Sequence, residues 1–243
     1  MPVLLSRMPV EVCSYRLSAR GRPVGSQTLK RSERGRTAFL EARLLLQGSL
    51  GQGTITQSSR CHAQRHHSHQ FREETQVRGE ARIYDVEFSA DEGLVVASRG
   101  RNDRATIPYV QPYRDPLSLL DELRAAAGAK DDGRPWRVPM LGKDVVVQRS
   151  GDVMLETALG PRRARVFVVH PGGSVVYVDV EPPHYLLRLV QRVEDGVVDA
   201  TIVRVHEDDE MESLESAPSE SEKQGARRRG RRRGRRRRGR RGT

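Results

Sequence analysis

The amino-acid sequence predicts a mostly β protein that combines antiparallel strands with one α-helix and a disordered C-terminal tail. Three observations lead to this fold class. Apolar residues recur at every second position in many segments of the first 206 residues, one central segment has helical spacing, and Arg and Gly dominate the C-terminus. We therefore divide the chain into a β-rich globular domain over residues 1–206, an acidic linker over 207–222 and a basic tail over 223–243.

The strand prediction begins with residues 37–44, where Ala38, Leu40, Ala42 and Leu44 occupy alternate positions and form one half-buried face. The same alternation predicts strands over 83–88, 94–97, 145–147, 165–169, 175–180, 185–193 and 197–205. Gly-containing turns separate these segments, and the Asp-Gly pair at 195–196 is typical of a tight β-hairpin. We expect ten or more antiparallel strands.

One α-helix is predicted between residues 115 and 128. Asp115 is a suitable N-cap, Pro116 fits the first helical position and Gly128 fits the end of the helix. Its apolar residues at helical spacing are Leu117, Leu120, Leu123 and Ala127. One side of the helix should therefore pack on the sheet. An exposed connector over 129–135 follows and separates a front half from a back half.

Two short segments resemble a bacterial family of domains of unknown function. They are Tyr15-Arg-Leu-Ser-Ala-Arg-Gly-Arg-Pro-Val-Gly25 and Asp115-Pro-Leu-Ser-Leu-Leu-Asp-Glu-Leu-Arg124, with a long antiparallel meander between them. The resemblance covers roughly residues 10–206. It implies an unclosed, LolA/LolB-like β-barrel, similar to the lipoprotein-localisation carriers, in which a curved sheet or half-barrel wraps around the helix. It also implies a concave apolar surface and a carrier role, and it offers no catalytic residues to transfer.

Several classes of protein are excluded by composition. No apolar run approaches the roughly 20 residues that span a bilayer, so we expect no integral membrane protein. The apolar start at residues 3–5 is soon interrupted by charged residues, and no export signal is visible whether translation begins at Met1 or Met8. Two cysteines, Cys13 and Cys61, are too few for a disulfide framework. We therefore expect a cytoplasmic protein.

The C-terminal tail is the strongest functional signal. The chain has 43 Lys and Arg against 32 Asp and Glu, and twelve Arg lie in the final 17 residues with Gly spacers between them. A disordered polycation binds phosphate by releasing counterions, regardless of base sequence. The predicted nucleic-acid-binding residues are Arg227, Arg228, Arg229, Arg231, Arg232, Arg233, Arg235, Arg236, Arg237, Arg238, Arg240 and Arg241. We expect DNA or RNA as the partner. The alternatives are an anionic membrane surface or a solubilising tail without a partner.

A second basic patch is predicted in the globular domain. Its candidate nucleic-acid-binding residues lie in two turn-like segments and are Arg99, Arg101, Arg104, Arg162, Arg163 and Arg165. Tyr109, Tyr113 and Trp136 are close enough in sequence to supply stacking rings to a single-strand groove. The alternative is that these aromatic residues pack against the sheet edge, and we favour that interpretation.

A dense group of histidines raises the question of a metal site. The weak candidate ligands are Cys61, His62, His66, His67 and His69. A structural zinc site needs four converging ligands, and period two on a strand would divide these five side chains between opposite faces. We therefore predict no metal site and interpret the segment as a polar strand with surface histidines.

Catalytic motifs are missing from the sequence. It contains no Gly-x-Ser-x-Gly elbow, phosphate loop or His-Glu-x-x-His motif. We predict a non-enzymatic, nucleic-acid-associated protein without a cofactor, which binds DNA or RNA by sequence-independent phosphate contacts. The alternative is a carrier for an apolar ligand, lipid or lipoprotein that uses the concave face of a half-barrel. The oligomeric state stays open.

Overall fold

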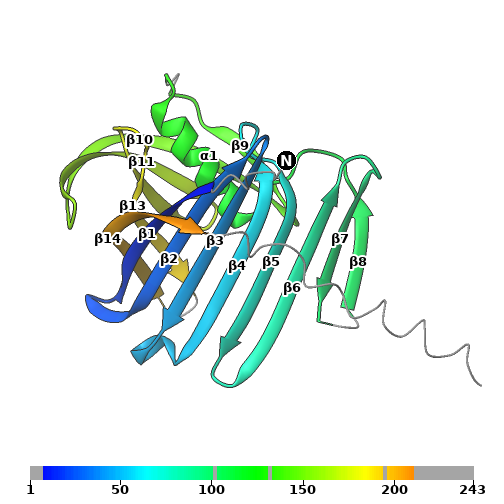
Figure 1. Ribbon diagram of the computed structural model, residues 1–243, viewed down its shortest axis with the longest axis horizontal. Helices are drawn as coiled ribbons and strands as arrows, with labels where there is room; N and C mark the ends of the chain where they lie inside the picture. Colours follow the sequence, from blue (N-terminus) through cyan, green and yellow to red (C-terminus); the bar gives the residue numbers. More distant parts are fainter. Residues whose placement is uncertain (1–7, 101–102, 131–132, 194–195, 211–243) are drawn as a thin grey trace, which may run out of the picture. The chain divides into compact units, whose positions relative to one another are not determined.

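The computed structural model describes residues 8–100, 103–130, 133–193 and 196–210, which form one antiparallel sheet of 14 strands and one α-helix (Figure 1). The prediction of a mostly β fold with one helix is confirmed. The first eight strands are β1 Met8–Ala19, β2 Arg22–Arg34, β3 Thr37–Leu46, β4 Gly53–His62, β5 Ser68–Val77, β6 Glu80–Ser89, β7 Leu94–Arg99 and β8 Asp103–Pro108. After α1 (Pro116–Gly128) follow β9 Trp136–Met140, β10 Lys143–Thr157, β11 Gly160–His170, β12 Ser174–Asp179, β13 Leu186–Val193 and β14 Gly196–Glu210. A short 3-10 helix, η1 (Gly48–Leu50), lies between β3 and β4.

The strands form two consecutive meanders that share one sheet. The spatial order is β8-β7-β6-β5-β4-β3-β2-β1-β14-β13-β12-β11-β10-β9. Pairing of β1 with β14, for example Leu17 with Ala200, joins the front half to the back half. Strands β8 and β9 are the two edges, so the sheet does not close into a barrel.

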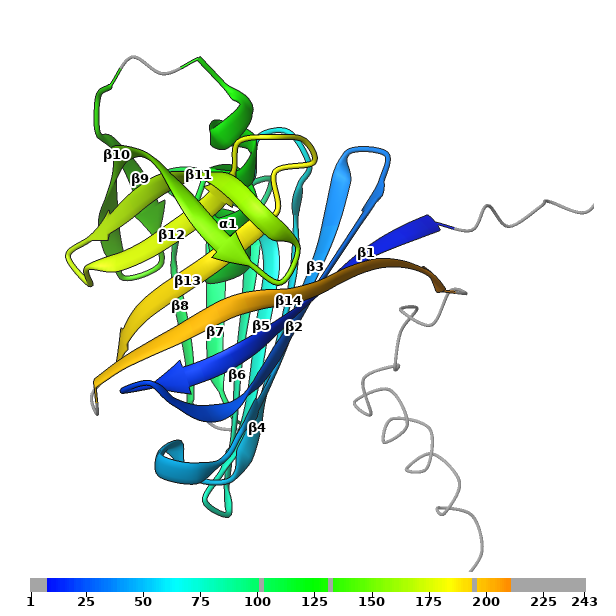
Figure 2. The same ribbon diagram turned by 90° about the vertical axis from the view of Figure 1, so that its left-hand side faces the viewer.

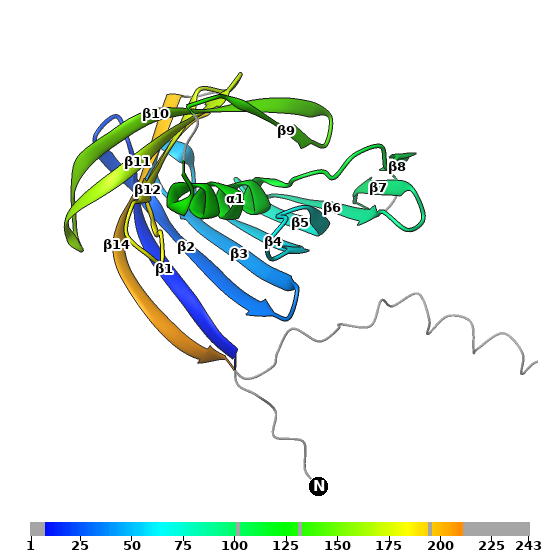
Figure 3. The same cartoon turned by 90° about the horizontal axis from the view of Figure 1, so that it is seen from above.

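The sheet is strongly curved, and its concave face surrounds α1 (Figures 2 and 3). Bulges help it to bend, because an extra residue in one strand increases the local twist. Val24 is such an extra residue, since Leu17 pairs with Gly25 and Ser18 with Pro23. A Cβ atom at Gly25 would lie 2.0 Å from the carbonyl oxygen of Leu45, so glycine allows β3 to approach here.

The helix begins as the sequence predicts. The Asp115 carboxylate accepts hydrogen bonds from the backbone N–H groups of Leu117 and Ser118, and Ser118 Oγ accepts one from the Asp115 N–H. The helix ends at Gly128, as expected. Its buried surface is wider than one stripe, because the concave sheet covers it from several sides. The buried side chains are Leu117, Ser118, Leu119, Asp121, Leu123 and Ala127, whereas Leu120 is only half-buried.

Two apolar clusters pack against the helix. The larger cluster combines β1, β2 and β9–β14 with the middle and end of α1, and includes Tyr15, Leu123 and Phe167. The smaller one combines β3–β7 with the start of α1, and includes Phe71 and Leu117. Both clusters lie on the concave side, so α1 holds the two halves of the sheet together.

The boundaries of the domain differ in detail from the expected ones. Strand β14 runs to Glu210, past the boundary expected at residue 206, because the start of β1 pairs with residues 207–210. The rest of the predicted acidic linker and the whole basic tail lie outside the described residues. No helix among the described residues has the length and apolar character that a bilayer span needs.

Candidate functional site

A cavity of about 880 Å³ lies between α1 and the concave face of the sheet. Helix α1 occupies the end of the sheet where β4 turns into β5, and the cavity opens at the opposite end, the lower one in Figure 1. The open end is framed by the turns that connect neighbouring antiparallel strands, because the chain reverses its direction there. The residues at these turns that line the cavity include Leu50, Arg78, Lys143, Gly172 and Val193.

Most of the cavity wall is apolar. The helix contributes Leu119, Leu120 and Leu123, and the sheet contributes alternate residues of its strands. The apolar sheet residues that line the cavity include Leu17, Leu44, Leu46, Ile55, Val145, Val169, Val176, Leu189 and Val198. A concave apolar space of this size falls within the range of small-molecule binding sites.

One sector of the wall is polar. It lies on β4, β5 and β6, where Gln57, Glu73, Thr75 and Arg82 face the cavity. These residues are cross-strand neighbours, since Gln57 pairs with Glu73 and Thr75 pairs with Arg82. The Glu73 carboxylate accepts hydrogen bonds from Gln57 Nε2 at 2.7 Å and from Thr75 Oγ1 at 3.4 Å. The cavity is therefore amphipathic.

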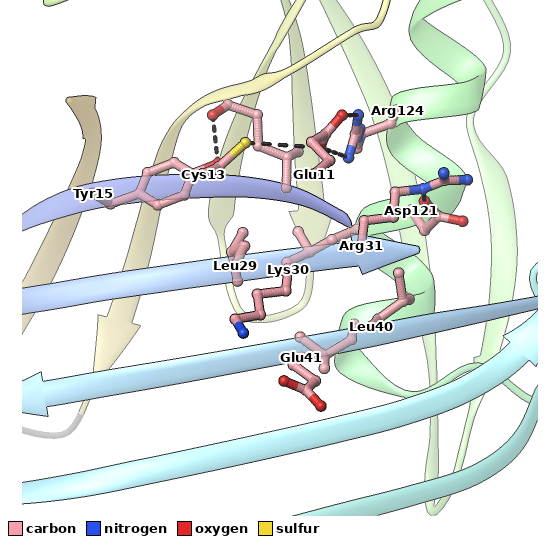
Figure 4. Close-up of a pocket in the computed structure, with 13 residues that line it drawn as sticks. Glu11, Cys13, Tyr15, Leu29, Lys30, Arg31, Leu40, Glu41, Asp121 and Arg124 are labelled. Carbon is pink, nitrogen blue, oxygen red and sulfur yellow. Dashed lines mark hydrogen bonds and ion pairs between the residues drawn. The ribbon is translucent and has the colours of Figure 1, made fainter. Parts of the chain in front are cut away.

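Ion pairs fix the helix to the sheet above the cavity (Figure 4). Arg124 donates to both carboxylate oxygens of Glu11, and Arg31 Nε lies 2.6 Å from Asp121 Oδ1. His66 Nδ1 lies 3.1 Å from the other Asp121 oxygen. Burial raises the pKa of Asp121, but the hydrogen bond with His66 and the charge of Arg31 outweigh burial and hold that pKa below its usual range.

Asp115 forms a second anchor at the start of α1. Besides capping the helix, its carboxylate accepts hydrogen bonds from Ser59 Oγ and Ser68 Oγ, each at 2.6 Å. Burial raises the pKa of Asp115, and the serine hydrogen bonds offset only part of that effect. The acidic groups with shifted pKa values in α1 and its cap thus connect the helix to strands, and they do not face the cavity.

Both cysteines are buried near these anchors. Cys13 lines a hollow of only about 30 Å³ beside Glu11 and Tyr15, which is room for about one water molecule. Burial raises the pKa of the Cys13 thiol to about 12, and the neighbouring Glu11 adds to the effect. Burial likewise raises the pKa of Cys61 to about 12, with Asp121 contributing. Neither thiol has the lowered pKa that a nucleophile needs.

The interpretation of residues 61–69 as a polar strand was wrong. Strand β4 ends at His62 and β5 begins at Ser68, and the chain reverses between them with His66 in a left-handed conformation at φ 55°. This turn separates His66 from the other histidines and buries it beside Asp121. Only His69 of the group is an exposed histidine.

The turn brings three imidazole rings into a row. The ring centroids of His62 and His67 are 5.1 Å apart, and those of His67 and His69 are 5.0 Å apart. Burial and the two neighbouring histidines lower the pKa of His67 to about 4. However, His62 Nδ1 accepts hydrogen bonds from the N–H groups of Gln64 and Arg65, so this nitrogen is already engaged. In the described part of the chain, no three His, Cys, Asp or Glu side chains are arranged to hold a metal ion.

The structure divides the first half of the predicted basic patch. Arg99 shares the concave side of β7 with Val95 and lies 5.7 Å from the ring centre of Tyr84. Arg104 pairs with Ser98 and therefore lies on the convex side. Arg101 lies outside the described residues. The two described arginines do not share one surface.

The second half of that patch is not in a turn. Arg162, Arg163 and Arg165 lie within β11, because the turn falls at residues 158–159. Their charges are paired, since Arg163 lies 2.9 Å and Arg165 3.2 Å from Asp152, and Arg162 lies 3.5 Å from Asp179. Arg165 also donates to the Ala127 carbonyl at the end of α1.

The aromatic residues near the predicted patch pack within the domain. Tyr113 is buried between Phe88 and Tyr109, and Trp136 stacks edge-on against Phe167. The twelve tail arginines lie outside the described residues. The described residues therefore bring together a cavity that the sequence did not locate, and they do not assemble the predicted patch.

The curved open sheet, the enclosed helix and the cavity together define a β-barrel-like protein with an unclosed barrel. Among solved structures, the chain is similar to a β-barrel-like protein of domain of unknown function DUF1849 from Brucella abortus. The match has a TM-score of 0.54 and 9% sequence identity, and it covers 84% of this chain and 98% of that chain. At this identity the likeness shows the fold alone. No family model matches the chain, and the comparison with curated proteins gave no match.

Only some of the residues that line the cavity could be predicted from the sequence. Leu44 belongs to a predicted strand face, and Leu119 and Leu123 belong to the predicted helix. Gln57 and Glu73 lie on strands without apolar alternation, and nothing in their local sequence distinguishes them from surface residues. A test for cross-strand pairing of inward polar residues could have found them, once the strands were placed.

Proposed function

We propose that this protein is a non-catalytic binding protein that holds an apolar or amphiphilic small molecule between α1 and the concave sheet. The observation that carries the proposal is the half-open cavity of about 880 Å³, whose wall consists mostly of leucine, valine and isoleucine side chains. Leaving such a wall in contact with water has a free-energy cost, which a bound apolar ligand would remove. The family that residues 15–25 and 115–124 resemble implies a carrier role, and this expectation supports the same class of ligand.

The arrangement of the helix supports this proposal. Ion pairs and capping hydrogen bonds hold α1 at one end of the sheet, so its leucine side chains can form a wall without filling the other end. A preformed cavity requires little reorganisation on binding. The buried carboxylates of Asp115 and Asp121 serve this anchoring, which favours binding over catalysis.

The test is a titration of the full chain with Nile red, a neutral dye that fluoresces strongly in apolar surroundings. Because the dye has no charge, the arginine tail does not attract it electrostatically. Saturable binding with one dye per protein molecule and a blue-shifted emission is expected. Fluorescence that rises without saturation, or no change beyond that of free dye, would contradict the proposal.

A second function is favoured by the charge of the tail. We propose that residues 223–243 bind DNA or RNA through phosphate contacts, because twelve arginines occur there without an aromatic residue to read bases. If half of them engage duplex phosphates, log K should fall with log salt concentration with a slope of about −5. Removal of residues 211–243 should abolish this binding and leave dye binding unchanged. Binding to anionic vesicles but not to oligonucleotides would identify a membrane surface as the partner and reject nucleic acid.

A further inference from the structure

The polar sector of the cavity contains an acidic group that the fold does not neutralise. Glu73 is half-buried on the concave side of β5, and its carboxylate contacts two neutral donors, Gln57 and Thr75. No Lys, Arg or His nitrogen of the described residues lies within ion-pair distance of it. The next residue, Glu74, faces the convex side and is paired with Arg72 at 2.6 Å.

The cations in or near this sector are engaged or lie at the mouth. Arg99 of β7 lies over the ring of Tyr84, the cross-strand neighbour of Glu73, 5.7 Å from the ring centre. Arg82 faces the cavity, but its Nη2 lies 2.6 Å from the Glu80 carboxylate, and both side chains are largely exposed. Arg78 and Lys143 are exposed residues at the turns that frame the opening. Water screens charges at such positions, whereas a carboxylate deeper in the wall keeps more of its field.

The two donors to Glu73 also orient it. Gln57 Nε2 is bound to one carboxylate oxygen and Thr75 Oγ1 to the other. Each carboxylate oxygen can accept a further hydrogen bond. A carboxylate accepts hydrogen bonds but donates none, so it favours an ammonium group over another carboxylate.

We infer that the ligand is a long-chain amphiphile with a primary ammonium group at its polar end, which binds Glu73 while its chain lies against the apolar wall. The apolar wall next to this sector begins at Ile55 on the same sheet and continues on α1 with Leu119 and Leu123. A single ligand can therefore contact both parts of the wall. This inference rests on the proposed binding function, and it adds the chemistry of the polar end.

The experiment measures displacement of Nile red from the full chain by dodecylamine, dodecanol and dodecanoate, each below its micelle concentration. All three compounds have the same alkyl chain, so differences in displacement between them report the effect of the polar end. Dodecylamine should displace the dye at a concentration roughly tenfold lower than dodecanoate, as a charge-assisted hydrogen bond implies. Equal or better displacement by dodecanoate would overturn the inference.

Two variants assign the effect to one residue. Glu73→Gln keeps the size and a hydrogen-bond acceptor but removes the charge, so the preference for dodecylamine should be lost. Glu74→Gln removes one negative charge from the convex side of β5, and this variant should keep the preference for dodecylamine. An unchanged preference in Glu73→Gln would overturn the inference. Failure of wild type to bind Nile red would instead reject the proposed function itself, and dye affinity in each variant shows that the cavity is intact.

Discussion

Arg124 of α1 and Glu11 of β1 form an ion pair with two hydrogen bonds, at 2.6 Å and 2.8 Å. The two residues are 113 positions apart in the chain, and their side chains are 12% and 20% exposed. Arg124 also donates to the carbonyl groups of Pro183 and His184, in the connection between β12 and β13. The pair thus connects the helix to both halves of the sheet, close to the β1–β14 junction.

We predict that Arg124→Met destabilises the protein by about 2 kcal/mol, because it leaves Glu11 partly buried without a partner. This value is below the roughly 3–5 kcal/mol typical of a fully buried pair, since both side chains retain some contact with water. Adding Glu11→Leu to Arg124→Met should recover part of the loss by removing the unpaired charge. The measurement is urea unfolding of the three proteins.

Arg137→Met is the matched control for this series. Arg137 is 80% exposed and lies 3.6 Å from Asp144, so its replacement should change the free energy of unfolding by no more than about 0.5 kcal/mol. An Arg124→Met protein as stable as this control would show that the pair does not anchor the helix.

Asp121→Asn should destabilise the protein in a pH-dependent manner. The pKa of Asp121 is lowered in the folded state, where His66 and Arg31 contact its carboxylate. Its stabilising effect is therefore present above the pKa of the unfolded chain, about 3.9, and is lost as the pH falls through the lower folded-state pKa. The difference in unfolding free energy between wild type and Asp121→Asn should shrink from pH 7 to about pH 3.

Asp115→Asn provides the opposite case. Burial raises the pKa of Asp115, so its ionised form is less favourable in the folded state than in the unfolded one. The stability associated with this group increases as the pH falls through the raised pKa. The difference between wild type and Asp115→Asn should therefore grow on acidification. The measurement is urea unfolding of each variant and of wild type at several pH values. A stability difference from wild type that changes in the same direction with pH for both variants would contradict these assignments.

Both thiols should be inert in the folded protein. Cys13 and Cys61 have pKa values raised to about 12 and are buried, with 3% and 0% exposure. At pH 8 roughly one thiol in ten thousand would be ionised. An aromatic disulfide reagent should therefore modify two thiols rapidly in denaturant and neither on the same timescale in buffer. Rapid modification of the Cys13→Ser protein in buffer would show that Cys61 is accessible.

The helix could be predicted because its signals are local. Asp115 and Pro116 act on the backbone of the next few residues, and no distant contact changes their preference. The predictions of back-half strands with apolar alternation, such as β12, were also correct, since these strands pack against the helix and each other. Here the periodicity of the sequence reflects an apolar inner face, whether its side chains pack in the core or line the cavity.

Strands β2, β4 and β5 could not be found in this way. Their inward positions include Gln57, Glu73 and Thr75, which face the cavity, and Arg31, which reaches Asp121. A strand shows apolar alternation only where its inner face is packed with apolar side chains. The missing pattern is thus a consequence of the polar sector of the cavity wall and of the ion pairs above the cavity.

The anchor residues illustrate the same limit. Asp121 lies in the second turn of the helix, where an acidic residue is usually exposed. It is buried here because Arg31 and His66 approach it from β2 and from the β4–β5 turn. Such convergence depends on the order of strands in the sheet, which sequence patterns do not reveal.

The most direct test of the cavity as a binding site compares two neighbouring leucines of β3. Leu44 lines the cavity, whereas Leu45 faces the convex side and is 45% exposed. Leu44→Trp should fill part of the cavity and weaken Nile red binding roughly tenfold or more, and Leu45→Trp should leave it unchanged. Urea unfolding confirms that both variants are folded. Equal dye affinity in wild type and in a folded Leu44→Trp protein would contradict the account.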